Sequence, residues 1–326
     1  MALQRDTRYP GRWTTGNSAH PQGAFKNRSA PGALDGSYIE QDWANDWDGF
    51  FASLLNAASI TPNNTVDAVG SSQYFTAMQS MLSQLGHGQC RLAVGSTTTL
   101  TLSPYNGRNV IVNGVQLQLP SAGVTYTISG LAASTLYYVY LSGTTAAPVL
   151  NLSTTAYVTN TNGVVVKSGD VTQTLVGMVS TNASTQFVDA ALSRTCLNWF
   201  NRRKIIADSA TQPGYTFSNL TGAEINSALR VTFLNWADDV PFISGVGTIS
   251  MTNQGTTSIA TSIDTVGNQY TPSQNITLQT GFSGGFSGHG ALGLSEGKHF
   301  TMLIGSVNVT TTTTVVNVQT IVQVNG

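Results

Sequence analysis

The apolar positions between residues 46 and 58 repeat with the period of an α-helix. They fall at i, i+3, i+4, i+7, i+8 and i+11, and comprise Trp47, Phe50, Phe51, Leu54, Leu55 and Ala58. This spacing places them on one face of a helix. Asp46 and Asp48 suit its first turn, because carboxylates there accept hydrogen bonds from free N–H groups and interact favourably with the helix dipole.

A second amphipathic helix is predicted from about residue 71 to residue 85, capped by Ser71 or Ser72. Its apolar face comprises Tyr74, Phe75, Met78, Met81, Leu82 and Leu85. Two short helices joined by a tight link form an αα-hairpin, assigned here to residues 46–89. Such a hairpin is too small to bury both faces by itself. We therefore predict an oligomer interface formed by Phe50, Phe51, Leu54, Leu55, Tyr74, Met78 and Leu82.

From residue 90 the pattern changes to the alternation typical of β-strands. It is clear in 97–102 and 110–119, and turn pairs such as Asn106–Gly107 and Asn113–Gly114 interrupt it. Further strands are expected in 124–141 and 164–167. Short strands at this spacing predict a β-sandwich domain over residues 90–204.

A second β-sandwich, of jelly-roll type, is predicted for residues 205–326. Its expected strands are 228–236, 246–251, 256–264, 275–278, 299–305 and 307–324. The glycine-rich stretch 281–297 is expected to be a loop that interrupts them, and its order is left open. It contains a G-x-G-x-x-G match at 288–293, which lacks the strand–helix context of a nucleotide site. The alternative is an exposed tip that contacts a ligand through Phe282, Phe286 and His289.

The first forty-five residues contain three prolines and five glycines, which disfavour regular helix and sheet. They also contain Trp13, Phe25, Tyr38 and Trp43, which is unusual for a disordered linker. We predict an extended arm over 1–45 that becomes ordered on a partner. The alternative is an arm that wraps over its own domain.

Charge is distributed unevenly along the chain. Eleven charged residues lie in the first fifty, whereas Arg108 is the only charge between Leu92 and Val166. Charged residues make up 9% of the chain, against roughly 25% in an average soluble domain. A net charge of −1 provides no field that would attract nucleic acid or an anionic membrane. Surfaces with so little charge are typical of proteins that bury much of their surface in an assembly.

Signals for targeting and membrane insertion are not evident in the sequence. Residues 1–9 carry no apolar segment of the kind found in signal peptides, and no run of about 18 apolar residues follows. We therefore expect assembly in a cytoplasm and no membrane insertion.

No motif indicates an enzyme or a cofactor. The four histidines do not have metal-ligand spacing, and Asp238–Asp239 is expected to be a turn. Cys90 and Cys196 are expected to be free thiols, with a single bridge between them as the alternative. The basic cluster 202–204 is interpreted as a linker or an interdomain ion-pair donor rather than a nucleic-acid site.

Three regions resemble proteins of tailed bacteriophages. The head segments 9–13, 21–28 and 35–43 resemble the N-terminus of tail fibres and related tail proteins. The stretch 166–170 (VKSGD), followed by 175–177 (LVG), Arg194 and 198–202 (NWFNR), is similar to a β domain recurring in phage virion proteins. That domain typically has the pattern "VKSGD…YLG…R…WNYYNR", from which residues 173–175 and 196–197 depart. The C-terminal part resembles the jelly-roll-like tips of such proteins.

The resemblance implies a homotrimeric, non-enzymatic virion protein of the phage tail, located in the virion and contacting other tail proteins. Its N-terminus would dock on the tail, where Trp13, Phe25, Trp43 and Trp47 are the expected anchors. Its C-terminus would contact a host receptor, either a polysaccharide or a protein. Two alternatives remain: a purely structural collar, baseplate or head-fibre component, and a polysaccharide depolymerase. A depolymerase would ordinarily need a long β-helix and paired carboxylates, neither of which the sequence indicates.

Overall fold

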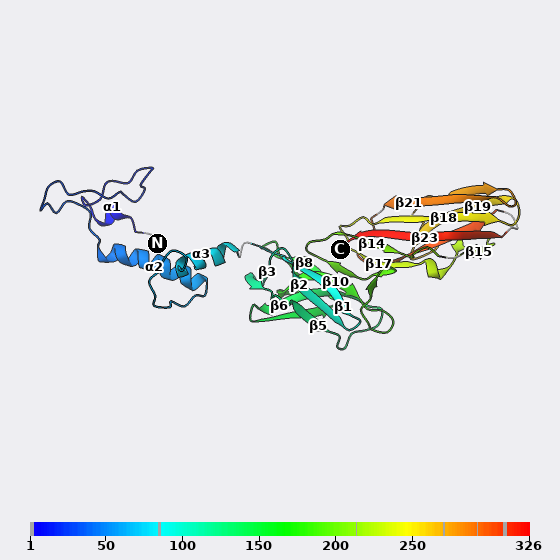
Figure 1. Cartoon of the computed structure of the whole chain (residues 1–326), viewed down its shortest axis with the longest axis horizontal. Coiled ribbons are helices and arrows are strands. Elements are labelled where there is room, and N and C mark those ends of the chain that lie inside the picture. The colour runs from blue at the N-terminus through cyan, green and yellow to red at the C-terminus, as the bar shows by residue number, and fades with distance from the viewer. Residues whose placement is uncertain (1–2, 84–85, 213, 270, 292, 309–311) are drawn as a thin grey trace. The chain divides into compact units, whose positions relative to one another are not determined.

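The computed structural model describes residues 3–83, 86–212, 214–269, 271–291, 293–308 and 312–326, with the backbone alone at 80, 82 and 83. The chain forms two compact units, Met1–Leu85 and Gly86–Gly326, called here the N-terminal unit and the β unit. Figure 1 shows helices in the first part of the chain and strands in the rest. The predicted class, mainly β with a short helical hairpin near the N-terminus, is confirmed.

The N-terminal unit contains the helices α1 (Arg5–Arg8), α2 (Gln41–Ala57) and α3 (Gln73–Ser83). Helix α2 begins five residues earlier than predicted and carries Asp42 in its first turn. Helix α3 is capped as the sequence predicts, because the hydroxyl of Ser72 accepts a hydrogen bond from the N–H of Phe75 at 3.0 Å. The carboxylate of Asp67 accepts a second bond, from the N–H of Gln73 at 3.0 Å.

The two longer helices pack against each other through part of their apolar surface. Leu55 of α2 and Ala77 of α3 are buried, and the rings of Phe51 and Tyr74 lie 4.6 Å apart. The expected αα-hairpin is therefore present.

Residues 3–40, here called the arm, differ from the predicted extended conformation. Apart from α1 and one antiparallel bridge between Trp13 and Phe25, the described part of the arm has no regular secondary structure. It folds back on itself, however: the N–H of Ser37 donates to the carbonyl of Lys26 at 2.9 Å. The aromatic side chains explain the difference, because folding back removes Trp13 from water.

The β unit begins with a sandwich of three sheets. One sheet has the order β1-β2-β5, the second has the order β7-β6-β10-β9-β8 with β13 added beside β10, and the third is the hairpin β3–β4. Its strands are β1 (Cys90–Ser96), β2 (Thr99–Pro104), β3 (Asn109–Val112), β4 (Val115–Gln118), β5 (Val124–Thr127), β6 (Leu136–Thr144), β7 (Ala147–Ser153), β8 (Tyr157–Thr159), β9 (Val165–Lys167), β10 (Asp170–Ser180) and β13 (Cys196–Asn198). Alternate apolar residues of these strands, such as Leu100, Val110 and Val139, form one buried core.

The turn between β3 and β4 is the Asn113–Gly114 pair that the sequence predicts. Both residues have positive φ, 52° and 72°, as a two-residue type I′ hairpin requires. Asparagine and glycine tolerate this backbone conformation better than other residues.

The second sandwich is built from two larger sheets. Their orders are β11-β12-β17-β22-β19-β20, with β16 beside β22, and β14-β23-β18-β21, with β15 beside β23. The strands are β11 (Asp189–Ala190), β12 (Ser193–Arg194), β14 (Lys204–Asp208), β15 (Tyr215–Phe217), β16 (Ala223–Glu224), β17 (Val231–Asn235), β18 (Phe242–Met251), β19 (Gly255–Ile263), β20 (Gln274–Leu278), β21 (Ser283–Ala291), β22 (Gly297–Val307) and β23 (Thr313–Asn325), and a 3-10 turn covers Ser227–Leu229. Ile259 and Leu303 of one sheet meet Ile249 and Val315 of the other in a buried core.

The glycine-rich stretch is a strand, and the predicted loop at 281–297 is therefore wrong over most of its length. Strand β21 pairs with β18 in an unbroken antiparallel register from Phe242–Ala291 to Ser250–Ser283 (Figure 1). Glycine has a low strand propensity, but a glycine of the partner strand β18 leaves room for Phe286 of β21 to pack. A Cβ atom on Gly247 of β18 would lie 2.7 Å from the ring of Phe286.

The two sandwiches are joined by a shared core. Tyr140, Met178 and Leu197 of the first sandwich pack in one cluster with Trp236 and Val322 of the second. In addition, β11 and β12 precede the expected boundary at residue 204 and yet belong to a sheet of the second sandwich. The β unit is consequently one compact body rather than two independent sandwiches.

Candidate interaction surfaces

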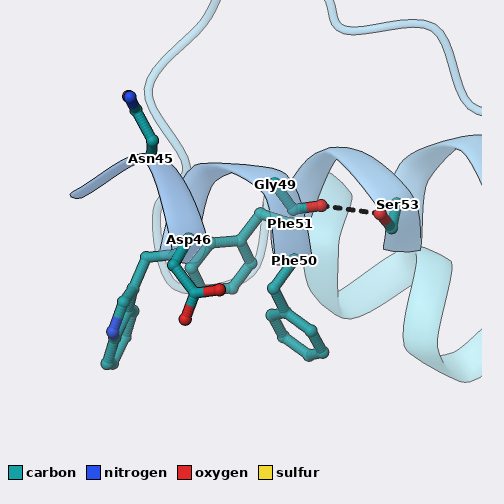
Figure 2. A pocket seen from close by; sticks show the side chains of 7 residues that line it. Asn45, Asp46, Gly49, Phe50, Phe51 and Ser53 are labelled. Carbon is teal, nitrogen blue, oxygen red and sulfur yellow. Dashed lines mark hydrogen bonds between the residues drawn. The ribbon is translucent and has the colours of Figure 1, made fainter. Parts of the chain in front are cut away.

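Helix α2 exposes a second apolar stripe that α3 does not cover. Trp47 is 53% exposed and Phe50 is 64% exposed. They border an open hollow of about 710 Å³, which is also lined by Asp46, Gly49 and Ser53. Figure 2 shows Phe50 pointing away from the helix, while the Ser53 hydroxyl donates to the Gly49 carbonyl at 2.6 Å. Exposed large aromatic side chains next to a hollow are typical of protein–protein contact surfaces.

Among the side chains described on α3, three more apolar ones are exposed: Phe75, Met78 and Met81. The predicted interface residues therefore divide into three groups by their exposure to solvent. Phe50 and Met78 face outward, Leu55 is buried between the helices, and Phe51, Leu54 and Tyr74 are half-buried. The side chain of Leu82, which was also predicted in this interface, lies outside the described residues.

The four predicted tail anchors form one aromatic cluster. Ring centroids of Trp13 and Phe25 lie 4.4 Å apart, those of Phe25 and Trp43 5.5 Å, and those of Trp43 and Trp47 6.0 Å. Phe25 and Trp47 are exposed, Trp43 is half-buried, and Trp13 is only 4% exposed. The arm therefore wraps over its own unit, which was the alternative that the sequence left open.

The predicted receptor tip is not assembled by the fold. Phe286 is 6% exposed and belongs to the core of the second sandwich, so its place in an exposed tip was wrong. Phe282 is 62% exposed and precedes β21, whereas His289 is exposed near the other end of that strand. Phe282 and His289 are seven positions apart, which corresponds to about 23 Å of extended chain. Strand alternation explains the error, because residues two apart share a face and Phe286 lies on the inner one.

His289 instead forms an exposed pair with Phe242, which the sequence did not single out. Their rings stack with centroids 6.0 Å apart and an interplanar angle of 30°. Phe242 is itself exposed at the start of β18. Only the pairing of β18 with β21 brings these residues together, so no local pattern could have indicated them.

The junction of the two sandwiches contains a polar and aromatic network. The carboxylate of Glu296 accepts hydrogen bonds from the hydroxyls of Tyr138 and Tyr157, both at 2.6 Å. Burial, followed by the hydrogen bond to Glu296 and then by the Glu296 charge, raises the pKa of both tyrosines well above the usual value. Trp199 and Trp236 lie 5.1 Å from each other beside Tyr157. Because both oxygens of Glu296 are engaged, the network binds the sandwiches together rather than offering a free carboxylate.

Arg202 belongs to the same junction. Its guanidinium lies 4.6 Å from the ring of Trp199 and 5.1 Å from that of Trp236. It also forms an ion pair with Asp238 at 2.6 Å. This confirms the interpretation of the basic cluster as an interdomain ion-pair donor, as far as Arg202 is concerned.

The described residues contain no group of three or more His, Cys, Asp and Glu side chains arranged to hold a metal ion. Within that same part of the chain, no helix is long and apolar enough to cross a membrane.

Cys90 and Cys196 are both free and buried, which confirms the predicted free thiols. Burial raises the pKa of the Cys90 thiol to about 12 and also raises that of Cys196. We expect neither thiol to react with a maleimide at neutral pH in the native protein, because the thiolate is the nucleophile. Mass spectrometry should find no label in buffer and two labels in denaturant. Rapid labelling of the native protein would contradict the buried position of these residues.

His87 lies at the start of the β unit. Its Nδ1 accepts a hydrogen bond from the N–H of Ile111 at 3.0 Å, and its ring lies 4.8 Å from that of Phe200. Burial lowers the pKa of His87, which favours the neutral form in the folded state. The unfolded chain therefore binds the proton first as the pH falls below about 6.5.

We expect the stabilisation from His87 to be complete above pH 6.5 and to be lost as the pH falls through the lower pKa of the folded state. Asparagine at this position retains an acceptor and does not titrate. The free energy of unfolding, measured by urea denaturation between pH 5 and pH 7.5, should therefore fall more with acid in the native protein than in His87→Asn. Parallel curves for the two proteins would exclude this role.

Comparison with known proteins gives no family. The chain matches no protein-family model and no curated protein. Among solved structures, it is similar to the infectious bursal disease virus Gx strain (12% identity, 72% of each chain, TM-score 0.26). It is also similar to dimeric latent PorU from Porphyromonas gingivalis (9% identity, 69% of this chain, 20% of that chain, TM-score 0.28). TM-scores this low assign neither a family nor a function.

Proposed function

We propose that this chain is a non-enzymatic structural protein of a bacteriophage virion, a homotrimeric tail fibre. In this proposal the N-terminal unit docks on other tail proteins, and the second sandwich contacts the host surface. The protein is assembled in the host cytoplasm and acts without cofactor, nucleic acid or membrane insertion. The observation that carries the proposal is the exposed aromatic surface of the N-terminal unit, formed by Phe25, Trp47, Phe50 and Phe75.

Two further features support this assignment. The surface lies in a small unit distinct from the β unit, as expected for an attachment module. The β unit carries very little charge, and a buried unpaired charge is costly, so a charge-poor surface suits an assembly. The assignment to a virion rests on the phage-like motifs. Residues 166–170 span the turn between β9 and β10, and residues 198–202 supply Trp199 and Arg202 to the junction of the two sandwiches.

The deciding experiment is the binding of fluorescently labelled full-length protein to live host cells, with unlabelled protein as competitor. Saturable binding that unlabelled protein displaces is expected. A folded oligomer that does not bind would remove the receptor-binding role. Release of oligosaccharide from host capsule by the purified protein would instead favour a depolymerase.

One observation favours the second candidate, a collar, baseplate or head-fibre component that contacts no receptor. The three residues predicted to form a receptor tip are dispersed, with Phe286 in the core. Incorporation into particles combined with an absence of cell binding is the result that would select this candidate.

The remaining exposed residues of that region allow a direct test of receptor contact. We expect Phe282→Ala combined with His289→Ala to lower the adsorption rate of reconstituted particles by about tenfold, as loss of an aromatic contact of 1–2 kcal/mol would. Leu220, which is also exposed in the second sandwich, provides the matched control Leu220→Ala. Equal adsorption by all three proteins would place the receptor contact elsewhere.

A further inference from the structure

The arm packs over the start of helix α2, and the small core between them contains buried N–H groups that have no hydrogen-bond partner. Trp13 lies at its centre, with the guanidinium of Arg5 4.7 Å from its ring on one side and Phe25 and Trp43 on others. The indole N–H of Trp13, the indole N–H of Trp43 and the Nε of Arg5 are all buried, and none has a hydrogen-bond partner. Each of these donors has lost its bond to water without a replacement, which weakens the packing.

The polar contacts that attach the arm to α2 are exposed or half-exposed. The guanidinium of Arg8 forms an ion pair with Asp42, and more than two-fifths of each side chain is accessible to solvent. The N–H of Leu3 donates to the carboxylate of Asp46 at 3.1 Å. Ion pairs of this kind contribute little to stability and are screened by salt.

The surface beneath the arm is continuous with the exposed surface of α2. Trp43 contacts Trp13 and Phe25 of the arm on one side and Trp47 on the other, with ring centroids within 6.0 Å in each case. Removal of the arm from α2 would therefore extend the apolar surface from Trp47 to Trp43 and free the two unpaired indole N–H groups.

We propose that the arm is a releasable cover: it sequesters Trp13 and Trp43 in the free protein and opens to complete the docking surface for a partner that supplies hydrogen-bond acceptors. This inference rests on the proposed docking function of the N-terminal unit. Its physical basis is a weak, solvent-exposed latch over a core with unpaired donors. The partner's carbonyl or carboxylate oxygens would accept the bonds that the closed arm leaves unmade.

Opening itself is measured by hydrogen exchange on the full-length protein, without any partner. The reporting amide is that of Leu3, which donates from the arm to the carboxylate of Asp46 on α2 at 3.1 Å. Asp42→Asn should accelerate its exchange about two- to fivefold, the effect of losing an exposed ion pair. Asp48→Asn on the same helix is the matched control and should leave the rate of amide exchange unchanged. Arm exchange as slow as that of the β18–β23 amides would overturn the proposal.

Coupling to docking is tested with a covalent latch. Arg8→Cys and Asp42→Cys are joined by a short bismaleimide that contains a cleavable disulfide, and each single variant treated with the same reagent is the control. The native cysteines are buried and do not compete. When the cross-link is closed, docking on purified virions assembled without this chain should fall at least about tenfold, because the cross-link prevents the open arm conformation that binds. Docking should recover after the cross-link is cleaved.

The outcomes separate the two proposals. If the latched and cleaved proteins dock equally well, the releasable cover is wrong and the docking function stands. If the unmodified protein does not dock at all, the docking function fails, and hydrogen exchange alone then decides whether the arm opens.

Discussion

Replacing Trp236 with alanine is expected to lower the free energy of unfolding of the β unit by about 3–5 kcal/mol. Trp236 is fully buried in the core shared by the two sandwiches. Its indole N–H donates to the carbonyl of Asn198 at 3.1 Å, and its ring packs on Trp199 and Tyr157. The substitution removes this ring and leaves a cavity between the two sandwiches.

Urea denaturation followed by circular dichroism measures this effect, and two variants make the result specific. Trp236→Phe retains most of the volume but leaves the Asn198 carbonyl unpaired, so a loss of about 1–3 kcal/mol is expected. Trp47→Ala, in the N-terminal unit, should leave the transition of the β unit unchanged. Because Trp236 joins the sandwiches, Trp236→Ala is also expected to split one cooperative transition into two. A loss below 1 kcal/mol with a single transition would show that the junction is not a packed core.

Replacing Phe50 and Met78 together with alanine is expected to weaken self-association of the chain at least about a hundredfold, the effect of losing two interface contacts worth about 3 kcal/mol in total. Both side chains belong to the predicted oligomer interface and are exposed, Phe50 on α2 and Met78 on α3. Since the large apolar side chains that face α3 are different ones, Phe51 and Leu55, the fold of the hairpin should persist.

Sedimentation equilibrium over a range of concentrations measures the change in association, and circular dichroism checks that helix content is retained. Asn56→Ala, an exposed polar position on α2, is the matched control. An unchanged oligomer in the double variant would exclude these two side chains from the oligomer interface.

Local sequence patterns determined those elements that depend on residues only a few positions apart. The 3.6-residue period of Trp47, Phe51 and Leu55 determines α2, because a helix sorts side chains by that period whatever surrounds it. Ser72 caps α3 through a bond to an N–H three residues away. Asn113–Gly114 forms the β3–β4 turn because positive φ is a property of those residue types.

The glycine-rich stretch shows where local patterns were insufficient. Glycine has no intrinsic preference for a strand, so the sequence favoured a loop over 281–297. The stretch is a strand because it pairs with nine residues of β18 in an antiparallel ladder, and no property of the stretch itself reveals that partner. The same pairing buries Phe286 and places His289 against Phe242, which is why the predicted tip was not formed.

The sequence by itself thus determined the mainly β class, the helical hairpin, its cap and its turns, all of which depend on residues within a few positions of one another. Only the tertiary structure decided which aromatic residues are buried and which are exposed. Trp13 and Phe25 lie twelve positions apart in the same arm, yet Trp13 is buried and Phe25 is exposed. Glu296 meets Tyr138 across 158 positions of sequence. Burial depends on what long-range packing places over a side chain, and in this chain that packing defines both the junction of the sandwiches and the candidate docking surface.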